Sequence, residues 1–116
     1  MQVIEPREVE PQAMEMQGAH KVTMRVVLGP DQGAPTFVMR LFEVEQGGYT
    51  PMHAHDWEHE VFILDGEGEL ASPDGRLPLH PGVAAVVLPG ETHQFVNVGD
   101  RVLRFLCIIP VQRACG

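Results

Sequence analysis

Short apolar and β-branched runs, each closed by a glycine or proline turn, constrain the fold of this chain more than any other feature. Past residue 20 the runs cover residues 22–28, 36–45, 59–64, 68–72, 76–79, 83–88, 94–98 and 102–109. Most of the 12 Gly and 10 Pro residues of the chain lie at the turns between them. No 11-residue window in this part shows a helical apolar stripe free of glycine and proline. Short, evenly spaced strands are typical of a sandwich or barrel, so the pattern predicts an all-β fold.

A length of 116 residues favours one domain, and no linker interrupts the chain. Residues 1–20 show no clear period and predict an N-terminal arm with a short strand, while residues 21–116 predict the barrel. No stretch approaches the length of an apolar membrane span, and the acidic N-terminus lacks the apolar segment of a secretory signal. We therefore expect a cytoplasmic protein with no membrane partner.

The charge balance is acidic, with a formal net charge of -8. Nucleic-acid binding needs a basic footprint, so this balance disfavours nucleic acid as a partner. Between Arg40 and Arg76 the chain has no Lys or Arg, but it has nine Asp or Glu residues and three of the six histidines. A segment of that sign attracts cations, although a solvated acidic face is the simpler interpretation of the acids alone.

The histidines of this segment form a pattern that packing alone does not explain. His53 and His55 are two residues apart, so on an extended chain both imidazoles point to the same face. His59 begins the next predicted strand and can return toward them if the two strands pair. His93 follows a turn 34 residues later and offers a fourth imidazole from the opposite side. This spacing predicts a metal site.

The remaining histidines and the two cysteines carry less information. His20 and His80 lie outside the cluster, and we treat both as ordinary surface or structural residues. Cys107 and Cys115 form neither a CxxC motif nor a Cys/His zinc spacing, which disfavours a structural zinc site and a disulfide framework. Cys115 is the penultimate residue, and we expect it to be frayed.

Two stretches resemble the paired motifs of the cupin superfamily. The first motif, Gly-x5-His-x-His-x3,4-Glu-x6-Gly, corresponds in order to Gly47, His53, His55, His59 and Gly66. The second, Gly-x5-Pro-x-Gly-x2-His-x3-Asn, corresponds in order to Gly82, Leu88, Gly90, His93 and Asn97. The resemblance implies a single-domain antiparallel jelly-roll β-barrel. It also implies a homodimer, in which residues 1–20 could be a strand exchanged between subunits.

The chain departs from these motifs at two positions. Leu88 replaces the family proline, and Pro89 stands next to it. His59 replaces the glutamate ligand, and Glu60 would fit only the longer spacing. If His59 faces the interior of the barrel, Glu60 faces away, so we predict a four-histidine site. The chain resembles small bacterial cupins of this type, which implies one divalent ion per chain, with Mn or Fe favoured and Zn, Ni or Cu possible.

Four further residues are candidates for the cavity. Phe105 and Cys107 share the apolar face of one predicted strand, and Cys107 is either a core thiol or a group beside the metal. Arg40 lies mid-strand, either on the outer face with an acidic partner, which we favour, or inward, where it could hold a substrate carboxylate. Trp57 lies between the ligands and either shields the metal or packs against another subunit.

The sequence does not name the substrate. A metal held by uncharged imidazoles predicts a dioxygenase-like oxidoreductase acting on a small organic molecule. A non-redox isomerase or decarboxylase is the alternative, and a binding or sensing protein without turnover is the third possibility, because one fold hosts many functions.

Overall fold

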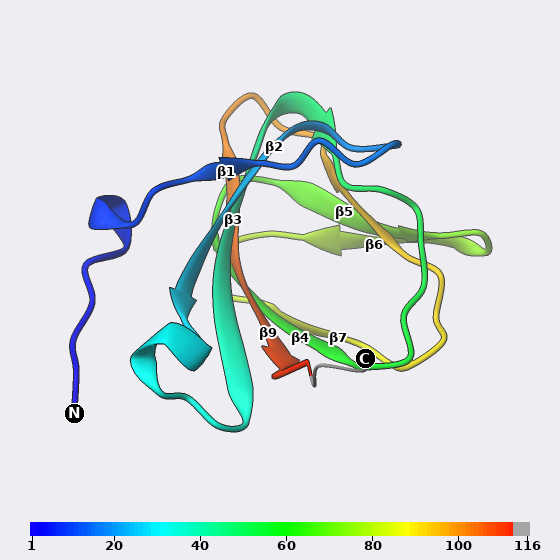
Figure 1. Ribbon diagram of the computed structural model, residues 1–116. Helices are drawn as coiled ribbons and strands as arrows, with labels where there is room; N and C mark the ends of the chain where they lie inside the picture. Colours follow the sequence, from blue (N-terminus) through cyan, green and yellow to red (C-terminus); the bar gives the residue numbers. More distant parts are fainter. Residues whose placement is uncertain (113–116) are drawn as a thin grey trace.

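The computed structural model describes residues 1–112 and is built almost entirely from antiparallel strands (Figure 1). The strands are β1 (Gln12–Ala13), β2 (His20–Leu28), β3 (Phe37–Tyr49), β4 (His59–Asp65), β5 (Gly68–Ser72), β6 (Gly75–Leu79), β7 (Ala84–Val87), β8 (Gln94–Asn97) and β9 (Leu103–Pro110). Two short 3-10 turns, Pro6–Glu8 and Pro30–Gln32, are the only helical segments of the described residues. None of the described helical segments has the length and apolar character needed to cross a membrane.

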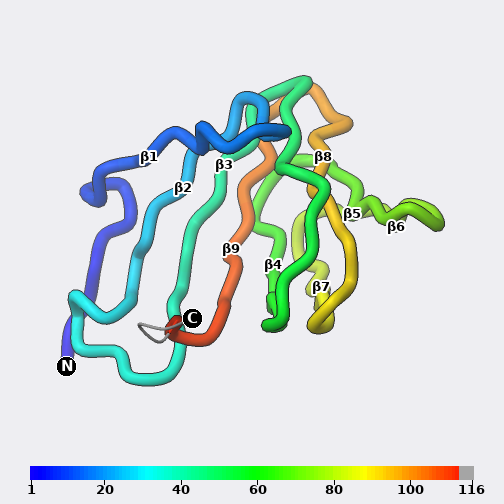
Figure 2. The backbone as a smooth tube through the Cα atoms, turned by 45° about the vertical axis from the view of Figure 1, so that its right-hand side comes forward, coloured from blue at the N-terminus to red at the C-terminus, as the bar shows by residue number. Residues whose placement is uncertain are grey.

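The strands form one curled sheet in the order β6-β5-β8-β3-β9-β4-β7, with β2 paired to β3 and β1 paired to β2. Figure 2 shows β2, β3, β9 and β4 side by side, while the β5–β6 hairpin projects on the other side of the molecule. β3 joins β8 only near its end, where Tyr49 pairs with Val96. The sheet therefore curls there into the second layer. This arrangement confirms the predicted all-β jelly-roll barrel.

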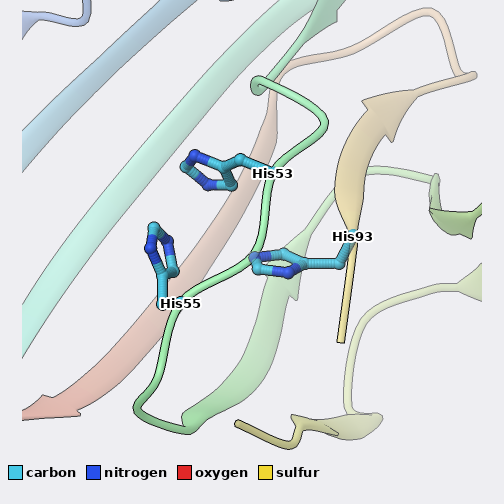
Figure 3. A group of neighbouring side chains, drawn as sticks. All are labelled: His53, His55 and His93. Carbon is cyan, nitrogen blue, oxygen red and sulfur yellow. The ribbon is translucent and has the colours of Figure 1, made fainter. Parts of the chain in front are cut away.

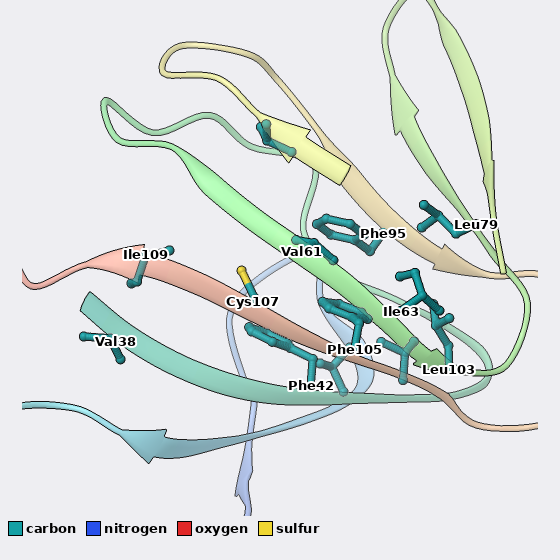
Figure 4. Close-up of a cluster of buried hydrophobic side chains, with 13 residues drawn as sticks. Val38, Phe42, Val61, Ile63, Leu79, Phe95, Leu103, Phe105, Cys107 and Ile109 are labelled. Carbon is teal, nitrogen blue, oxygen red and sulfur yellow. The ribbon is translucent and has the colours of Figure 1, made fainter. Parts of the chain in front are cut away.

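The core lies inside the curl and follows the alternation of the strands (Figure 4). In β9 the residues Leu103, Phe105, Cys107 and Ile109 are buried, and the residues between them are only partly buried. Successive side chains of a strand point to opposite faces, so this alternation places one face of β9 in the interior. The ring of Phe105 stacks on Phe42 at 5.2 Å and on Phe95 at 4.8 Å. The prediction that Phe105 and Cys107 face the interior is confirmed.

The strand predicted to end before Gly47-Gly48 continues to Tyr49. The two glycines form an irregular stretch of pairing with β2, where the register shifts between His20 and Val22. A side chain at Gly48 would place its Cβ 2.7 Å from the carbonyl oxygen of His20. Glycine here therefore permits a close backbone approach at a bulge, rather than ending the strand.

The N-terminal arm lies along β2. β1 pairs with it through Gln12 and Ala13, and the side chain of Arg25 donates a hydrogen bond to the carbonyl oxygen of Val9 at 3.0 Å. Arg25 and Arg104 both form ion pairs with Glu43, and this contact anchors Arg25 on the outer face of the sheet. The arm is thus held on the strand that flanks β3, and β3 carries part of the site described next.

Candidate metal centre

Three histidines gather at one end of the barrel. One ring nitrogen from each of His53, His55 and His93 lies within 4.8 Å of the others, close enough for all three to contact one ion. The rings of His53 and His55 are 4.2 Å apart, and the ring of His93 is 5.2 Å from His53. Figure 3 shows His53 and His55 on one segment, with His93 on the neighbouring segment that leads into β8.

Backbone pairing brings these segments together. His53 and His93 form an isolated antiparallel bridge, in which each amide donates to the other's carbonyl oxygen, at 3.0 and 2.9 Å. The sequence left open whether the His53 segment pairs with the strand starting at His59, and it does not. Both edges of β4 are already occupied, by β7 and by β9. The loop therefore pairs with the segment before β8, which brings His93 next to His53.

His59 lies next to this group but is not part of it. It is the first residue of β4, is 6% exposed, and has its ring 5.0 Å from His55 and 4.9 Å from His93. Its Nδ1 lies 3.1 Å from the Cys107 sulfur, and its Nε2 is buried without a hydrogen-bond partner. Glu60 is exposed, as the strand alternation predicts.

The environment keeps these imidazoles neutral. Burial, followed by the charges of His55, His93 and Arg40, lowers the pKa of His53 to about 4. Burial and then the charge of Arg40 lower the pKa of His59 to about 3. Burial is also the main cause that lowers the pKa of His55. At neutral pH these rings therefore keep a free lone pair, which is the form that binds a metal.

Arg40 points into the barrel, so the outer position favoured from the sequence is wrong. It pairs with Cys107 in the register of β3 and β9 and shares the face of the buried residues Phe42 and Val44. Its Nη2 donates to the Cys107 sulfur at 3.0 Å, and its guanidinium carbon lies 4.9 Å from the centre of the Phe42 ring. Its Nε is buried without a partner. The face it occupies was ambiguous because the neighbouring Leu41 is also buried.

Cys107 and Trp57 complete the surroundings of the histidines. Cys107 is 1% exposed and belongs to the core, yet it contacts both Arg40 and His59. Burial raises the pKa of its thiol, so it is a neutral group at neutral pH. Trp57 stacks on His55 with ring centres 4.6 Å apart, which shields that ring. Cys115 lies outside the described residues.

These side chains surround a cavity of about 150 Å³. It is lined by all four histidines, by Arg40, Trp57 and Cys107, and by three phenylalanine rings. Met14 and Met16 of the N-terminal arm also line it, and sequence reasoning missed both. Their position depends on how the arm folds back over β2, so no local pattern marks them. Among the described residues, no Asp or Glu lines the cavity.

The donor set fits a divalent transition metal. Neutral imidazole is a common ligand for Zn, Cu, Fe and Ni, and three such nitrogens already lie close together. The buried Nε2 of His59 has no hydrogen-bond partner, and a metal bond would remove the cost of leaving it unsatisfied. The arrangement therefore suggests a metal ion, and its identity is not fixed by these residues.

Comparisons with known proteins place the chain among related sequences and structures. The family described as Cupin domain matches residues 40–109. A polyketide cyclase from Streptomyces resistomycificus is 34% identical, with a TM-score of 0.91 over 98% of this chain and 82% of that chain. The four histidines of the cavity, together with Arg40 and Cys107, lie within the matched residues, whereas Met14 and Met16 lie before them.

Two curated relatives match over shorter lengths. A 1-methylthio-D-xylulose 5-phosphate methylsulfurylase from Rhodospirillum rubrum is 34% identical over 76 residues, which is 65% of this chain and 48% of the relative. An oxalate-binding protein from Thermotoga maritima is 32% identical over 74 residues, which is 60% of this chain and 61% of the relative. The matches thus span about half to three fifths of these relatives, which carry different activities.

Proposed function

This chain belongs to the cupin family, and from that premise we propose that it is a metal-dependent enzyme that closes rings in small polycarbonyl compounds. One observation carries this proposal: the histidine group faces an apolar cavity whose only charged lining side chain, among the described residues, is Arg40. The similarity to a polyketide cyclase over nearly the whole chain supports the same chemistry. The whole protein's activity and substrate are part of the proposal.

The proposed ligands are His53, His55, His59 and His93. A metal held there would act as a Lewis acid that polarises a substrate carbonyl. The protein's own residues perform the other tasks. Arg40 stabilises negative charge on an enolate oxygen, because a fixed cation in a desolvated site interacts strongly with developing charge. The phenylalanine rings exclude water and hold the apolar part of the substrate.

The reaction class is an intramolecular aldol condensation. The enolate carbon attacks a second carbonyl of the same molecule, one carbon–carbon bond forms, and one water is lost. No oxidant or reductant is consumed. A cavity of about 150 Å³ admits a compact molecule or the reacting end of a longer one.

We expect the metal-loaded protein to convert a linear triketone to its cyclised product at the same rate with and without oxygen. The measurement is product absorbance in an anaerobic cell and in air, with metal-stripped protein as the control. Binding of the triketone without conversion would contradict the enzyme proposal and favour a binding protein.

A dioxygenase-like oxidoreductase is the second candidate. Four uncharged imidazoles would leave the full charge on the ion, and the open cavity could admit oxygen beside an enolic substrate. The same experiment separates the two functions. Stoichiometric oxygen uptake with a diketone or catechol, and loss of turnover under anaerobic conditions, would replace the cyclase proposal with this one.

The role of His59 gives a sharper prediction about the ligand set. We expect His59→Ala to weaken metal binding by at least the roughly 10- to 100-fold loss that is typical of a residue that supports a metal site without binding the ion. Glu60→Ala is the matched control, because Glu60 is the next residue and points away from the cavity. Titration of metal-free protein with Zn²⁺ and Mn²⁺ measures both variants. A larger loss for Glu60→Ala would restore a three-histidine, one-glutamate set.

We favour Mn or Fe as the resident ion, a cytoplasmic location, and a homodimer in which residues 1–20 contact the partner. β1 pairs with β2 of its own chain here, so strand exchange would have to replace that pairing. Sedimentation of the full chain and of a variant lacking the arm would test the dimer.

A further inference from the structure

Arg40 is an arginine without an acidic partner. The salt bridges of the described residues involve five other arginines, namely Arg7, Arg25, Arg76, Arg101 and Arg104. Among residues 1–112, Arg40 has no carboxylate within ion-pair distance. Each of those five already has a carboxylate partner, whereas Arg40, which is partly buried, lines the cavity. Removing a charge from water without a partner is costly, so an unpaired arginine at this position needs a reason.

The guanidinium is held in place but not satisfied. One of its nitrogens donates to the Cys107 sulfur at 3.0 Å, and its guanidinium carbon lies over the Phe42 ring, 4.9 Å from the ring centre. These two contacts hold the guanidinium in place. The Nε is buried and has no hydrogen-bond partner. An arginine presents its donors as a planar fork that matches two oxygens of an anion.

The charge of Arg40 also opposes the expected metal. Its Nη2 lies 3.0 Å from the Cys107 sulfur, and the Nδ1 of His59 lies 3.1 Å from the same sulfur, so its positive charge stands close to the imidazoles. A divalent cation on those imidazoles would experience the same repulsion, which is stronger in a desolvated cavity than in water. No Asp or Glu of the described residues lines the cavity to offset either charge. A bound anion between them would relieve both.

We propose that Arg40 and the histidine group form the two ends of one anion subsite, which takes a small anion with two conjugated oxygens. A carboxylate and the enolate of a 1,3-dicarbonyl compound share this chemistry. The inference rests on the proposed function and deepens it, because it requires the substrate to enter as an anion. The oxygens at one end of the anion accept from the Arg40 guanidinium, and the rest of the anion lies toward the histidines within a cavity of about 150 Å³.

The first test uses the unmodified chain without metal. Sodium benzoate and sodium acetylacetonate are the two anion probes, and benzamide is the neutral isostere of benzoate. Trp57 is the only tryptophan of the chain and lines the cavity, so its fluorescence reports binding. We expect at least one anion to bind at least 10-fold more tightly than benzamide. Tighter binding of benzoate would identify the ligand as a carboxylate, and tighter binding of acetylacetonate would identify it as the enolate of a 1,3-dicarbonyl compound. Equal binding of benzoate, acetylacetonate and benzamide would overturn the proposal.

The second test changes Arg40. We expect Arg40→Gln to weaken binding of the preferred anion about 10- to 100-fold, as for loss of a charged hydrogen bond, with benzamide unchanged. Arg76→Gln is the matched control, because Arg76 pairs with Glu69 on the surface. Arg40→Lys keeps the charge and serves as a second variant if the glutamine variant does not fold. An anion affinity within twofold of wild type in both Arg40→Gln and Arg40→Lys would overturn the proposal.

The third test reads the coupling between anion and metal. Binding linkage is reciprocal, so the anion should tighten Zn²⁺ binding in the wild type. In Arg40→Gln we expect Zn²⁺ to bind more tightly than in the wild type when no anion is present, because a repulsive charge is gone. Binding of the anion without any binding of metal would contradict the proposed function but would still support the anion subsite. Weaker Zn²⁺ binding in Arg40→Gln would contradict the electrostatic argument.

Discussion

Replacing His53 with alanine is expected to abolish stoichiometric metal binding. His53 is one of the three histidines whose ring nitrogens lie within 4.8 Å of one another. Loss of one would leave His55 and His93 as a two-nitrogen site beside His59. A direct ligand should matter more than the supporting groups whose loss costs 10- to 100-fold, so we expect a drop in affinity above about 100-fold. Elemental analysis of protein purified without added metal measures the occupancy, and titration of the metal-free protein measures the affinity.

The fold should survive this change. The bridge between His53 and His93 uses only backbone atoms, so alanine keeps both hydrogen bonds. His80→Ala is the control, because His80 is exposed and lies outside the cavity. A β-rich circular dichroism spectrum with no metal is the expected result for His53→Ala. Unchanged metal content in this variant would show that the ion is held elsewhere.

Most of the fold could be predicted from the alternation of apolar and polar residues along single strands. A period of two identified the buried face of β9, because every second residue from Leu103 to Ile109 is apolar and lies inside. The same rule placed Glu60 outside and His59 inside. These predictions depend only on local backbone geometry, which the sequence pattern reflects directly. The glycine and proline turns then separated the strands to within a few residues.

Features that depend on pairing between distant segments could not be predicted in the same way. The pairing partner of the His53 segment could not be predicted, because the sequence does not show that both edges of β4 are occupied. The inward face of Arg40 was the less favoured alternative, because a charged residue among apolar neighbours fits either side of a strand. Met14 reaches the cavity only through the path of the arm over β2. In each case the position is set by tertiary contacts rather than by local periodicity.

The two motifs mix residues with chemical and with structural roles. The histidines supply nitrogen atoms, but the motif glycines Gly66 and Gly82 supply only backbone freedom. Both have positive φ, at 86° and 91°. They differ in surroundings, because a Cβ at Gly66 would meet backbone atoms of the segment entering β9, whereas a Cβ at Gly82 would meet nothing within 4 Å. This difference allows conformational strain to be separated from steric conflict.

Gly66→Ala is therefore expected to be strongly destabilising. Its Cβ would lie 2.5 Å from the carbonyl oxygen of Val102 and 2.7 Å from the Cα of Leu103, and both are backbone atoms that cannot rotate away. Leu103 is fully buried in the core, so moving it disturbs the start of β9. Left-handed strain and overpacking together predict a loss of about 2 to 5 kcal/mol in the free energy of unfolding. Urea denaturation of metal-free protein measures it without a contribution from ligand binding.

Gly82→Ala is the matched control, because it carries the same backbone strain in open space. We expect it to cost about 1 to 2 kcal/mol, the strain of a left-handed residue alone. The excess loss at Gly66 is then the steric term, which acts through the segment entering β9 that continues to Phe105 and Cys107 beside the site. Equal losses at the two glycines would mean that the chain relaxes around the Gly66 methyl group. In that case the motif glycine would be needed only for its φ, and the strand beneath the histidines would tolerate movement.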